Sequence, residues 1–278
     1  MNIDDSIVQL DTTLCSLNLR KYNDRKSIQM IKDLGSFMYS DIKAISSLLD
    51  KDSVVVDVGA NIGGFTCGIS KFVCNVYSVD PSRETLEVLR SNVKLNNLNN
   101  VQVIHAGAGD INSEMKIVHT NISSSTYLLN EGSGEVVKVG RIDDLIPGRV
   151  DFIKIDAEGM DVQVIKGARS KIIEYKTGLF VEYWAHDWKN DFKELLEYRK
   201  ILGKDYNFYL NLKSSLNTRE DFYFGRLPSI LLMFFSTGTQ DFYAIHKSKK
   251  VKHIKPHYLV ILLFLKKIKT KIERFAIK

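Results

Sequence analysis

At 278 residues the chain is long enough to bury one substantial core with an appendage, and its three cysteines show no C-x-x-C spacing that would indicate a zinc site or a disulfide framework. Of the net charge of +6, the tail from His246 to Lys278 carries +10 (ten lysines and Arg274 against Glu273), so the rest of the chain is mildly acidic at −4. A general nucleic-acid-binding face on that body is therefore disfavoured.

Residues 1–36 are mixed and weakly periodic, and we interpret them as an N-terminal extension of the folded domain. The first ten residues lack an apolar run of signal-peptide length, so a cytoplasmic location is expected rather than export. From 40 to 49 the apolar residues fall on one helical face, which predicts a helix capped by Ser40 or Asp41.

A strand, a glycine turn and a helix are predicted next, from Ser53 to Phe72. Three valines lead into Asp57-Val58, a β-branched apolar run typical of a strand buried on both faces of a parallel sheet. Gly59 and Gly63 allow a tight turn, and the apolar periodicity after them is helical. Together these segments form the first half of a nucleotide-binding βαβ unit.

The second strand, Asn75–Val79, ends at Asp80, about 20 residues past the glycines, where an acid can accept hydrogen bonds from both ribose hydroxyls. Asn61 stands where a dinucleotide site has its middle glycine, and the chain has no G-x-x-x-x-G-K-[ST] phosphate loop. A nucleoside ligand without phosphates fits better, and S-adenosylmethionine is the obvious one. The residues expected to bind this cofactor are Asp57, Gly59, Asn61, Gly63 and Asp80.

A helix from Ser82 to Leu95 and a third strand, Val101–His105, follow. The turn after this strand brings small residues, among them Ala108, and the acid Asp110 to the same edge of the sheet. Asp110 either faces a ligand at this edge or is a turn residue whose side chain hydrogen-bonds its own backbone. The segment 111–140 is rich in Ser, Thr, Asn and Gly around two short strand-like pieces, 115–118 and 136–139, and is either a substrate loop or a surface hairpin.

The fourth strand, Val150–Ile155, is followed at its carboxyl end by Asp156 and Glu158. Ligands of open α/β sheets lie beyond the carboxyl ends of the strands, so we expect this acidic turn to face the site. Lys154 lies inside the apolar strand and therefore needs a buried partner.

Gly178–Trp184 is predicted as the fifth strand, with Glu182 inside it and His186 just beyond it. An acid in a central strand is costly unless it is paired, so Glu182 is expected to meet a polar partner or a ligand. His186 is either a base or a solvated loop residue. An amphipathic helix, 191–202, and late strands at 207–213, 230–235 and 241–246 complete the sheet.

Four of these stretches resemble the FkbM-type methyltransferase family: D-V-G-A-N-I-G-G-F-T, V-D-P, D-F-I-K-I-D-A-E-G-M-D-V-Q-V-I-K-G-A and V-E-Y-W. The resemblance runs from Ser53 to Trp184 and departs at Asp161, where members usually carry Glu. It implies a class I methyltransferase fold: an α/β, Rossmann-like, mostly parallel sheet with helices on both faces and an antiparallel late strand. In that fold the turn with Ala108 and Asp110 lies at the edge that holds adenine, so both are candidate cofactor contacts.

The resemblance also implies methyl transfer from S-adenosylmethionine, commonly to a hydroxyl, here of a sugar, a glycan or another small metabolite. The acceptor-side residues are expected to be Asp156, Glu158, His186 and Glu182, with no metal required. The N/D-P-P-Y/F turn of amino-methylating enzymes is missing, since none of the four prolines are adjacent. A nicotinamide oxidoreductase, an aminopropyl transferase and a non-catalytic S-adenosyl-binding scaffold stay open as alternatives.

The predicted domains are the N-terminal extension 1–36, a methyltransferase domain 37–250 and a basic tail 251–278. In the tail, the apolar run Tyr258–Leu265 is far too short to span a bilayer, but it adjoins five basic residues interleaved with Ile268, Ile272 and Phe275. This pattern is typical of a peptide lying in a membrane interface, and equally of a solvated helix packed on its own domain. A peripheral membrane contact is therefore one of two expectations for the tail.

Overall fold

The computed structural model describes residues 6–35, 38–119, 126–129, 134–185, 188–211, 224–227, 238–239, 241–251 and 253–254. The chain divides into two compact units, Met1–Val181 and Glu182–Lys278. The helices of the first unit are α1 (Arg25–Leu34), α2 (Tyr39–Ser46), α3 (Gly64–Ile69), α4 (Arg83–Leu95), α5 (Ile142–Leu145), α6 (Asp161–Gly167) and α7 (Arg169–Tyr175), with a 3-10 turn at Ser70–Phe72. Its strands are β1 (Ile7–Asp11), β2 (Ser16–Arg20), β3 (Val54–Val58), β4 (Asn75–Asp80), β5 (Val101–His105), β6 (Gly107–Ala108), β7 (Ser113–His119), β8 (Thr126–Leu129), β9 (Glu135–Gly140), β10 (Phe152–Ile155) and β11 (Gly178–Val181).

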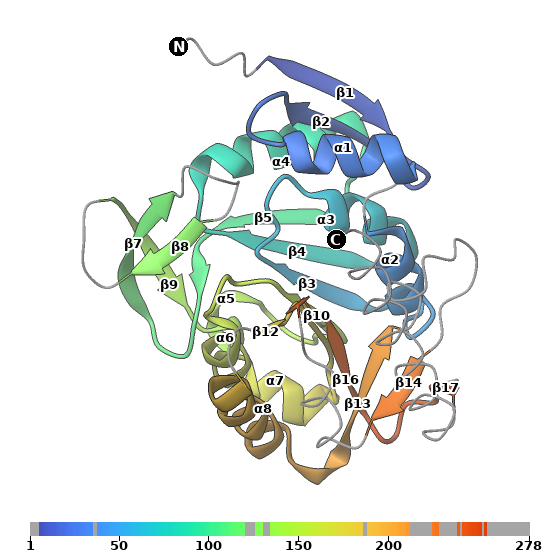
Figure 1. Ribbon diagram of the computed structural model, residues 1–278, viewed down its shortest axis with the longest axis vertical. Helices are drawn as coiled ribbons and strands as arrows, with labels where there is room; N and C mark the ends of the chain where they lie inside the picture. The colour runs from blue at the N-terminus through green and yellow to red at the C-terminus, as the bar shows by residue number, and fades with distance from the viewer. Residues whose placement is uncertain are drawn as a thin grey trace, which may run out of the picture. The chain divides into compact units, whose positions relative to one another are not determined.

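Parallel strands in the order β11-β10-β3-β4-β5 form the central sheet of the first unit (Figure 1). The chain runs outward from β3 through β4 to β5, and then returns to the other side of β3 with β10 and β11. The order of the strands therefore reverses between β3 and β10. In open α/β sheets, ligands bind outside the carboxyl ends of the strands at such a switch point.

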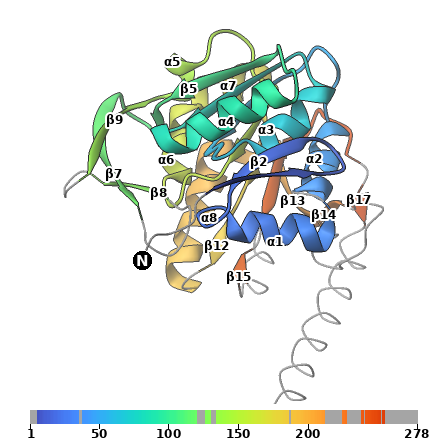
Figure 2. The ribbon, with the colours of Figure 1, turned by 90° about the horizontal axis from the view of Figure 1, so that it is seen from above.

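Helices cover both faces of this sheet, which explains the continuous apolar runs of its strands. Val55 and Val56 of β3 and Ile153 and Ile155 of β10 are fully buried. Helices α3 and α4 contact β4, and α4 also lies against β5 (Figure 2). The fold is that of class I methyltransferases, as predicted, and the strands β3, β4, β5 and β10 lie within two residues of their predicted bounds.

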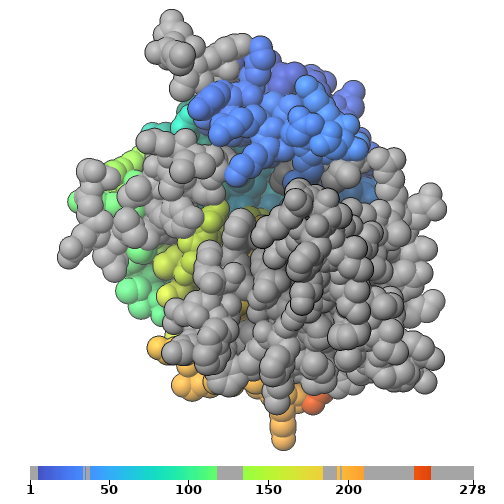
Figure 3. Space-filling model, viewed as in Figure 1, coloured from blue at the N-terminus to red at the C-terminus, as the bar shows by residue number. Residues whose placement is uncertain are grey.

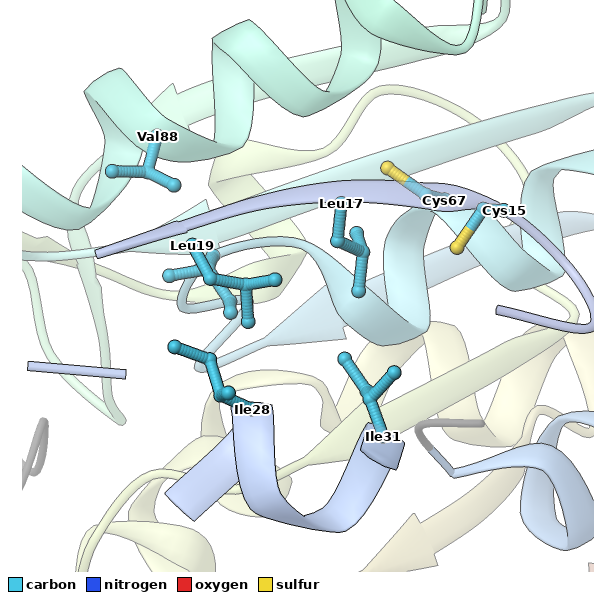
Figure 4. Close-up of a cluster of buried hydrophobic side chains, with 8 residues drawn as sticks. Cys15, Leu17, Leu19, Ile28, Ile31, Cys67 and Val88 are labelled. Atoms are coloured by element: carbon cyan, nitrogen blue, oxygen red, sulfur yellow. The ribbon is translucent and has the colours of Figure 1, made fainter. Parts of the chain in front are cut away.

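Residues 7–34 form a β-hairpin and a helix that the weak periodicity did not predict. The blue atoms of this segment form a continuous part of the surface in Figure 3. Beneath them, Leu17 and Leu19 of β2 and Ile31 of α1 pack into one buried cluster with Cys67 of α3 and Val88 of α4 (Figure 4). Cys67 is fully buried in this cluster.

Side-chain amides of α4 pair with the backbone of β2. Asn92 accepts a hydrogen bond from Asn18 N at 2.6 Å and donates to Asn18 O at 3.1 Å. One helical turn on, Asn96 accepts from Ser16 N at 2.9 Å and donates to Ser16 O at 2.7 Å. Asn92 Nδ2 also donates to Ile62 O at 2.8 Å, which links the hairpin to the glycine turn after β3.

The segment after β5 forms a separate sheet in the order β6-β9-β7-β8, drawn in green in Figure 1. The two strand-like pieces predicted there are confirmed by β7 and β9, which pair antiparallel. Two predicted boundaries are wrong. The helix α2 begins at Tyr39 with Met38 as its N-cap, and β11 ends at Val181 rather than at Trp184.

The second unit contains α8 (Trp188–Leu202), a 3-10 turn (Gly203–Asp205), β12 (Trp184–Ala185), β13 (Tyr206–Asn211), β14 (Phe224–Leu227), β15 (Gly238–Thr239), β16 (Phe242–His246) and β17 (His253–Ile254). As predicted, its late strands include an antiparallel pair, β13 with β16. Tyr183, Tyr198 and Phe242 pack their rings together, and all three are buried. The predicted strand 230–235 and nearly all of the tail lie outside the described residues. Within the described part, no helix has the length and apolarity needed to cross a membrane.

Candidate active site

A hollow opens at the carboxyl ends of β3, β4 and β10, where the sheet reverses its order. It contains about 600 Å³ of empty space, part of it open to solvent. The lining residues are Val58, Gly59, Asn61, Val79, Asp80, Pro81, Thr85, Ala106, Gly107, Ala108, Asp156, Ala157, Glu158 and Met160. Among them, the charged side chains are the three carboxylates Asp80, Asp156 and Glu158.

The turn after β3 is held in place by its neighbours on both sides. Gly59 N and Ala60 N both donate to Val79 O, at 2.9 and 3.2 Å. Gly59 has φ +71°, and a Cβ there would overlap Asp156 O, so only glycine lets the two turns approach this closely. We refer to residues 59–61 as the Gly59 turn and to residues 156–158 as the Asp156 turn.

Asp80 joins the Gly59 turn to the start of α4. Its Oδ2 accepts from Asn61 N at 2.9 Å, and its Oδ1 accepts from Ser82 N at 2.9 Å and from Thr85 Oγ1 at 2.8 Å. Burial raises the pKa of this carboxyl, against the lowering effect of the hydrogen bonds. A carboxylate offers about four acceptor positions, so one, on Oδ2, is left for a ligand.

Asn61 brings an unsatisfied acceptor to the same hollow. Its backbone is left-handed, with φ +49°, a conformation that asparagine adopts more readily than most residues. Its Oδ1 is buried and has no hydrogen-bond partner among the described residues. A buried acceptor without a partner is costly, and here it lines a hollow where a ligand's donor would satisfy it.

The Asp156 turn forms the opposite wall. Glu158 has φ +46°, which is uncommon for a side chain of its kind and places strain at a site-lining turn. Ala157 N donates to Asp161 Oδ1 at 3.0 Å, so the aspartate that departs from the usual glutamate still caps this turn. Lys154 Nζ lies 3.4 Å from Asp156 Oδ2 and 3.3 Å from Asp57 Oδ1, which confirms that the buried lysine has acidic partners.

Asp57 lies beneath the Gly59 turn and does not line the hollow. It is fully buried, and its Oδ2 accepts from Thr66 Oγ1 at 2.6 Å. Thr66 Oγ1 lies in turn 2.8 Å from Ser78 Oγ. Asp57 therefore joins β3 to α3 and β10, and it stabilises the turn from below.

The structure brings together six of the residues predicted from the sequence: Gly59, Asn61, Asp80, Ala108, Asp156 and Glu158 all line the hollow. Gly63 has φ +86° at the N-cap of α3 and lies outside the lining, while Asp110 is exposed. Glu182 is half-buried in the second unit, just past the end of β11, and His186 lies outside the described residues.

Thr85 and Met160 are among the eight lining residues that were not predicted as site residues. Thr85 follows the N-cap Ser82 by three residues, so the capping pattern could have placed it at the start of α4. Met160 carries no local signal. No group of three or more metal-ligating side chains occurs within the described ranges.

The residues present fit S-adenosylmethionine. The remaining acceptor position of Asp80 suits a ribose hydroxyl, and Asn61 Oδ1 can accept from a hydroxyl or an ammonium group. Ala106, Gly107 and Ala108 are small and leave room for a flat base beside them.

This sheet, with its hollow at the switch point, defines a class I methyltransferase. A model of the methyltransferase FkbM domain matches residues 57–209, more than half of the chain. The chain belongs to the FkbM methyltransferase family, whose methyl donor is S-adenosylmethionine.

Two relatives and one solved structure illustrate the similarity. The hexuronic acid methyltransferase AglP of Haloferax volcanii is 24% identical over 192 residues, which cover 66% of this chain and 75% of the relative. Methyltransferase 1 of Beauveria bassiana is 27% identical over 179 residues, covering 52% and 71%. The crystal structure of methyltransferase FkbM from Methylobacillus flagellatus matches with a TM-score of 0.50 and 22% identity, over 78% of this chain but only half of that one.

Proposed function

We propose that this protein is an S-adenosylmethionine-dependent O-methyltransferase that acts on a hydroxyl of a sugar, a glycan or another small metabolite. The family match supports methyl transfer over the oxidoreductase and aminopropyl-transferase alternatives. The sugar substrate named for AglP supports a carbohydrate acceptor. The observation that carries the proposal is the placement of Asp80 and of the Asp156 turn in the walls of one hollow.

In this proposal the two walls have different tasks. Bound S-adenosylmethionine would supply an electrophilic methyl group. The Gly59 turn, Asn61 and Asp80 would hold the nucleoside, and the small residues from Ala106 to Ala108 would face the adenine. Alignment of the acceptor oxygen with the methyl group would provide most of the acceleration.

Asp156 or Glu158 would take the proton of the acceptor hydroxyl, a step that typically contributes about 10²–10⁴-fold to the rate. Both carboxylates line the hollow, and Asp156 also lies 3.4 Å from the ammonium group of Lys154. Asp156→Asn and Glu158→Gln remove the charge of each side chain but keep its size, so they test proton transfer more directly than alanine does. Whichever variant loses turnover while retaining its affinity for S-adenosylhomocysteine identifies the base.

The cofactor half of the proposal is tested by calorimetry with S-adenosylhomocysteine. Asp80→Asn is expected to bind at least tenfold more weakly, because a hydrogen bond to a charged acceptor is worth about 1.5–3 kcal/mol. Asp52→Asn, an exposed acid in the turn before β3, is the matched control and should bind as the unmodified protein does. Equal affinity of Asp80→Asn and the control would remove the ribose assignment.

The transfer half is tested by mass spectrometry of candidate acceptors after incubation with S-adenosylmethionine. The expected product gains one methyl group on oxygen, and treatment with a chelator leaves its rate unchanged. Cofactor binding without turnover on any sugar or small-metabolite acceptor would favour a scaffold role. A rate that falls with chelator and returns with magnesium would contradict the metal-free mechanism.

A further inference from the structure

Lys154 is a buried cation in the central sheet, directly beneath the hollow. It lies on β10 opposite Asp57 of β3, and only 3% of its surface is exposed. Burying an ammonium group is expensive unless all of its protons are bonded and its charge is balanced. The positions of its partners therefore indicate which parts of the structure Lys154 holds together.

The ammonium group has two hydrogen-bond acceptors and one ion-pair partner. Nζ donates to Gly59 O at 3.0 Å and to Asp156 Oδ2 at 3.4 Å, and it forms an ion pair with Asp57 Oδ1 at 3.3 Å. One of these partners belongs to the Gly59 turn, one to the Asp156 turn and one to β3, the strand that leads into the Gly59 turn. The lysine thus connects the two walls of the hollow from below.

The same two turns also touch directly. A Cβ built on Gly59 would overlap Asp156 O, which shows that the backbones of the two turns are in contact. The charge of Lys154 also acts on Asp80, where it lowers the pKa of the carboxyl against the effect of burial. Lys154 is therefore the cation among three carboxylates, two of which line the hollow.

We propose that Lys154 is a positioning residue that sets the distance and orientation between the cofactor-holding Gly59 turn and the acceptor-holding Asp156 turn. The roles of the two turns rest on the proposed function, whereas the link between them does not. A misplacement of about 1 Å can lower turnover about 10²-fold, so a buried link of this kind matters to alignment even though it touches no substrate.

The test replaces the ammonium group without leaving a buried charge alone. The double variant Lys154→Met/Asp57→Asn keeps both side chains near their size, and a neutral pair of this kind is often as stable as the ion pair it replaces. The amide oxygen that Asp57→Asn introduces can still accept the hydrogen bond from Thr66. Lys171→Met is the matched control, because Lys171 is also buried but donates to Gly148 O at 2.8 Å and lies outside the lining of the hollow.

Amide hydrogen exchange measures how firmly the two turns are held, and it requires no ligand. In the double variant we expect the amides of Gly59, Asn61, Asp156 and Ala157 to exchange at least tenfold faster than in the unmodified protein. The amide of Val76, at the other end of β4, should not change, because it reports on the domain as a whole. In Lys171→Met all five amides should keep their relative protection.

Two outcomes would overturn the proposal: unchanged exchange at both turns, or an equal acceleration at Val76. Asp156→Asn supplies a second variant, at a side chain that is 32% exposed, and is expected to accelerate exchange at the Asp156 turn alone. Calorimetry with S-adenosylhomocysteine separates this proposal from the function. In the double variant, S-adenosylhomocysteine is expected to bind at least tenfold more weakly. If the unmodified protein does not bind this ligand, the proposed cofactor role is rejected, whereas hydrogen exchange still tests the link between the two turns.

Discussion

Asp80 illustrates how a single side chain can hold a turn in place and still face the hollow. Three of its acceptor positions bond the Gly59 turn and the start of α4, and one is left for a ligand. A change at Asp80 therefore alters the shape of the hollow as well as its chemistry. For this reason the conservative Asp80→Asn is a better probe than a truncation.

The stability contributed by Asp80 should depend on pH. Burial raises the pKa of its carboxyl above the ordinary value of 3.8. Between pH 3.8 and the raised pKa, the carboxyl of Asp80 is protonated in the folded state but ionised in the unfolded state. Its contribution to stability is therefore fully present below pH 3.8 and disappears as the pH rises through the raised pKa. The free energy of unfolding, relative to that of Asp80→Asn, should therefore fall with rising pH, as measured by urea denaturation of both proteins. A difference that grows with pH would contradict the raised pKa.

Gly59→Ala should abolish cofactor binding because its methyl group would enter the backbone of the Asp156 turn. Gly148→Ala is the control, since Gly148 has a similar φ of +67° but no atom within 4 Å of the added Cβ. Both variants should lose about 1–2 kcal/mol from left-handed strain. Urea denaturation is expected to show a further loss for Gly59→Ala only, and calorimetry to show no binding of S-adenosylhomocysteine. Equal effects of the two changes would mean that backbone strain alone matters.

One wall of the hollow was predictable from the sequence because its signals are local. Gly59, Asn61 and Asp80 stand at fixed spacings from two apolar strands, and the ends of parallel strands meet at one edge. Asp110 follows a strand end in the same way, yet its side chain is exposed. The direction in which a turn leaves the sheet depends on packing that the local sequence does not encode.

At the scale of elements, the amides of α4 should couple the N-terminal hairpin to Ile62, the residue that follows the Gly59 turn. Asn92→Ala leaves the backbone groups of Asn18 and Ile62 without their partner, at about 1–3 kcal/mol for each buried group. Asn96→Ala removes the equivalent pair with Ser16 but no contact to the turn. Thermal denaturation should show a loss for both variants, and calorimetry a weaker S-adenosylhomocysteine affinity for Asn92→Ala only. Equal affinities would show that the hairpin and the turn are independent.

The central strands were predicted well because a strand that is buried on both faces has a continuous run of apolar residues in its sequence. The hairpin was missed because only one of its faces is buried, so its signal is an alternation over a few residues. Cys15, Leu17 and Leu19 are buried and alternate by two, and this pattern could have identified β2. The end of β11 was misplaced because Tyr183 and Trp184, whose aromatic side chains are typical of strands, follow the last ladder residue closely.

At the scale of the whole molecule, the tail 251–278 stays a prediction, since nearly all of it lies outside the described residues. We propose that it binds anionic membranes, because each lysine or arginine near such a surface adds about 1 kcal/mol. Full-length protein should co-sediment with anionic vesicles at low salt, and a version ending at Lys250 should not. Neutral vesicles are the control. Both proteins staying in the supernatant would favour a tail that packs on its own domain.

The pairing of α4 with β2 also bears on how separate copies of the chain meet. A strand at the edge of a small sheet offers a row of free N–H and C=O groups, which can recruit a strand from another molecule and start aggregation. On β2 that row is already taken at Ser16 and Asn18, because Asn96 and Asn92 stand where a neighbouring strand would dock. Two asparagines one helical turn apart thus close this edge of the hairpin with side chains instead of backbone.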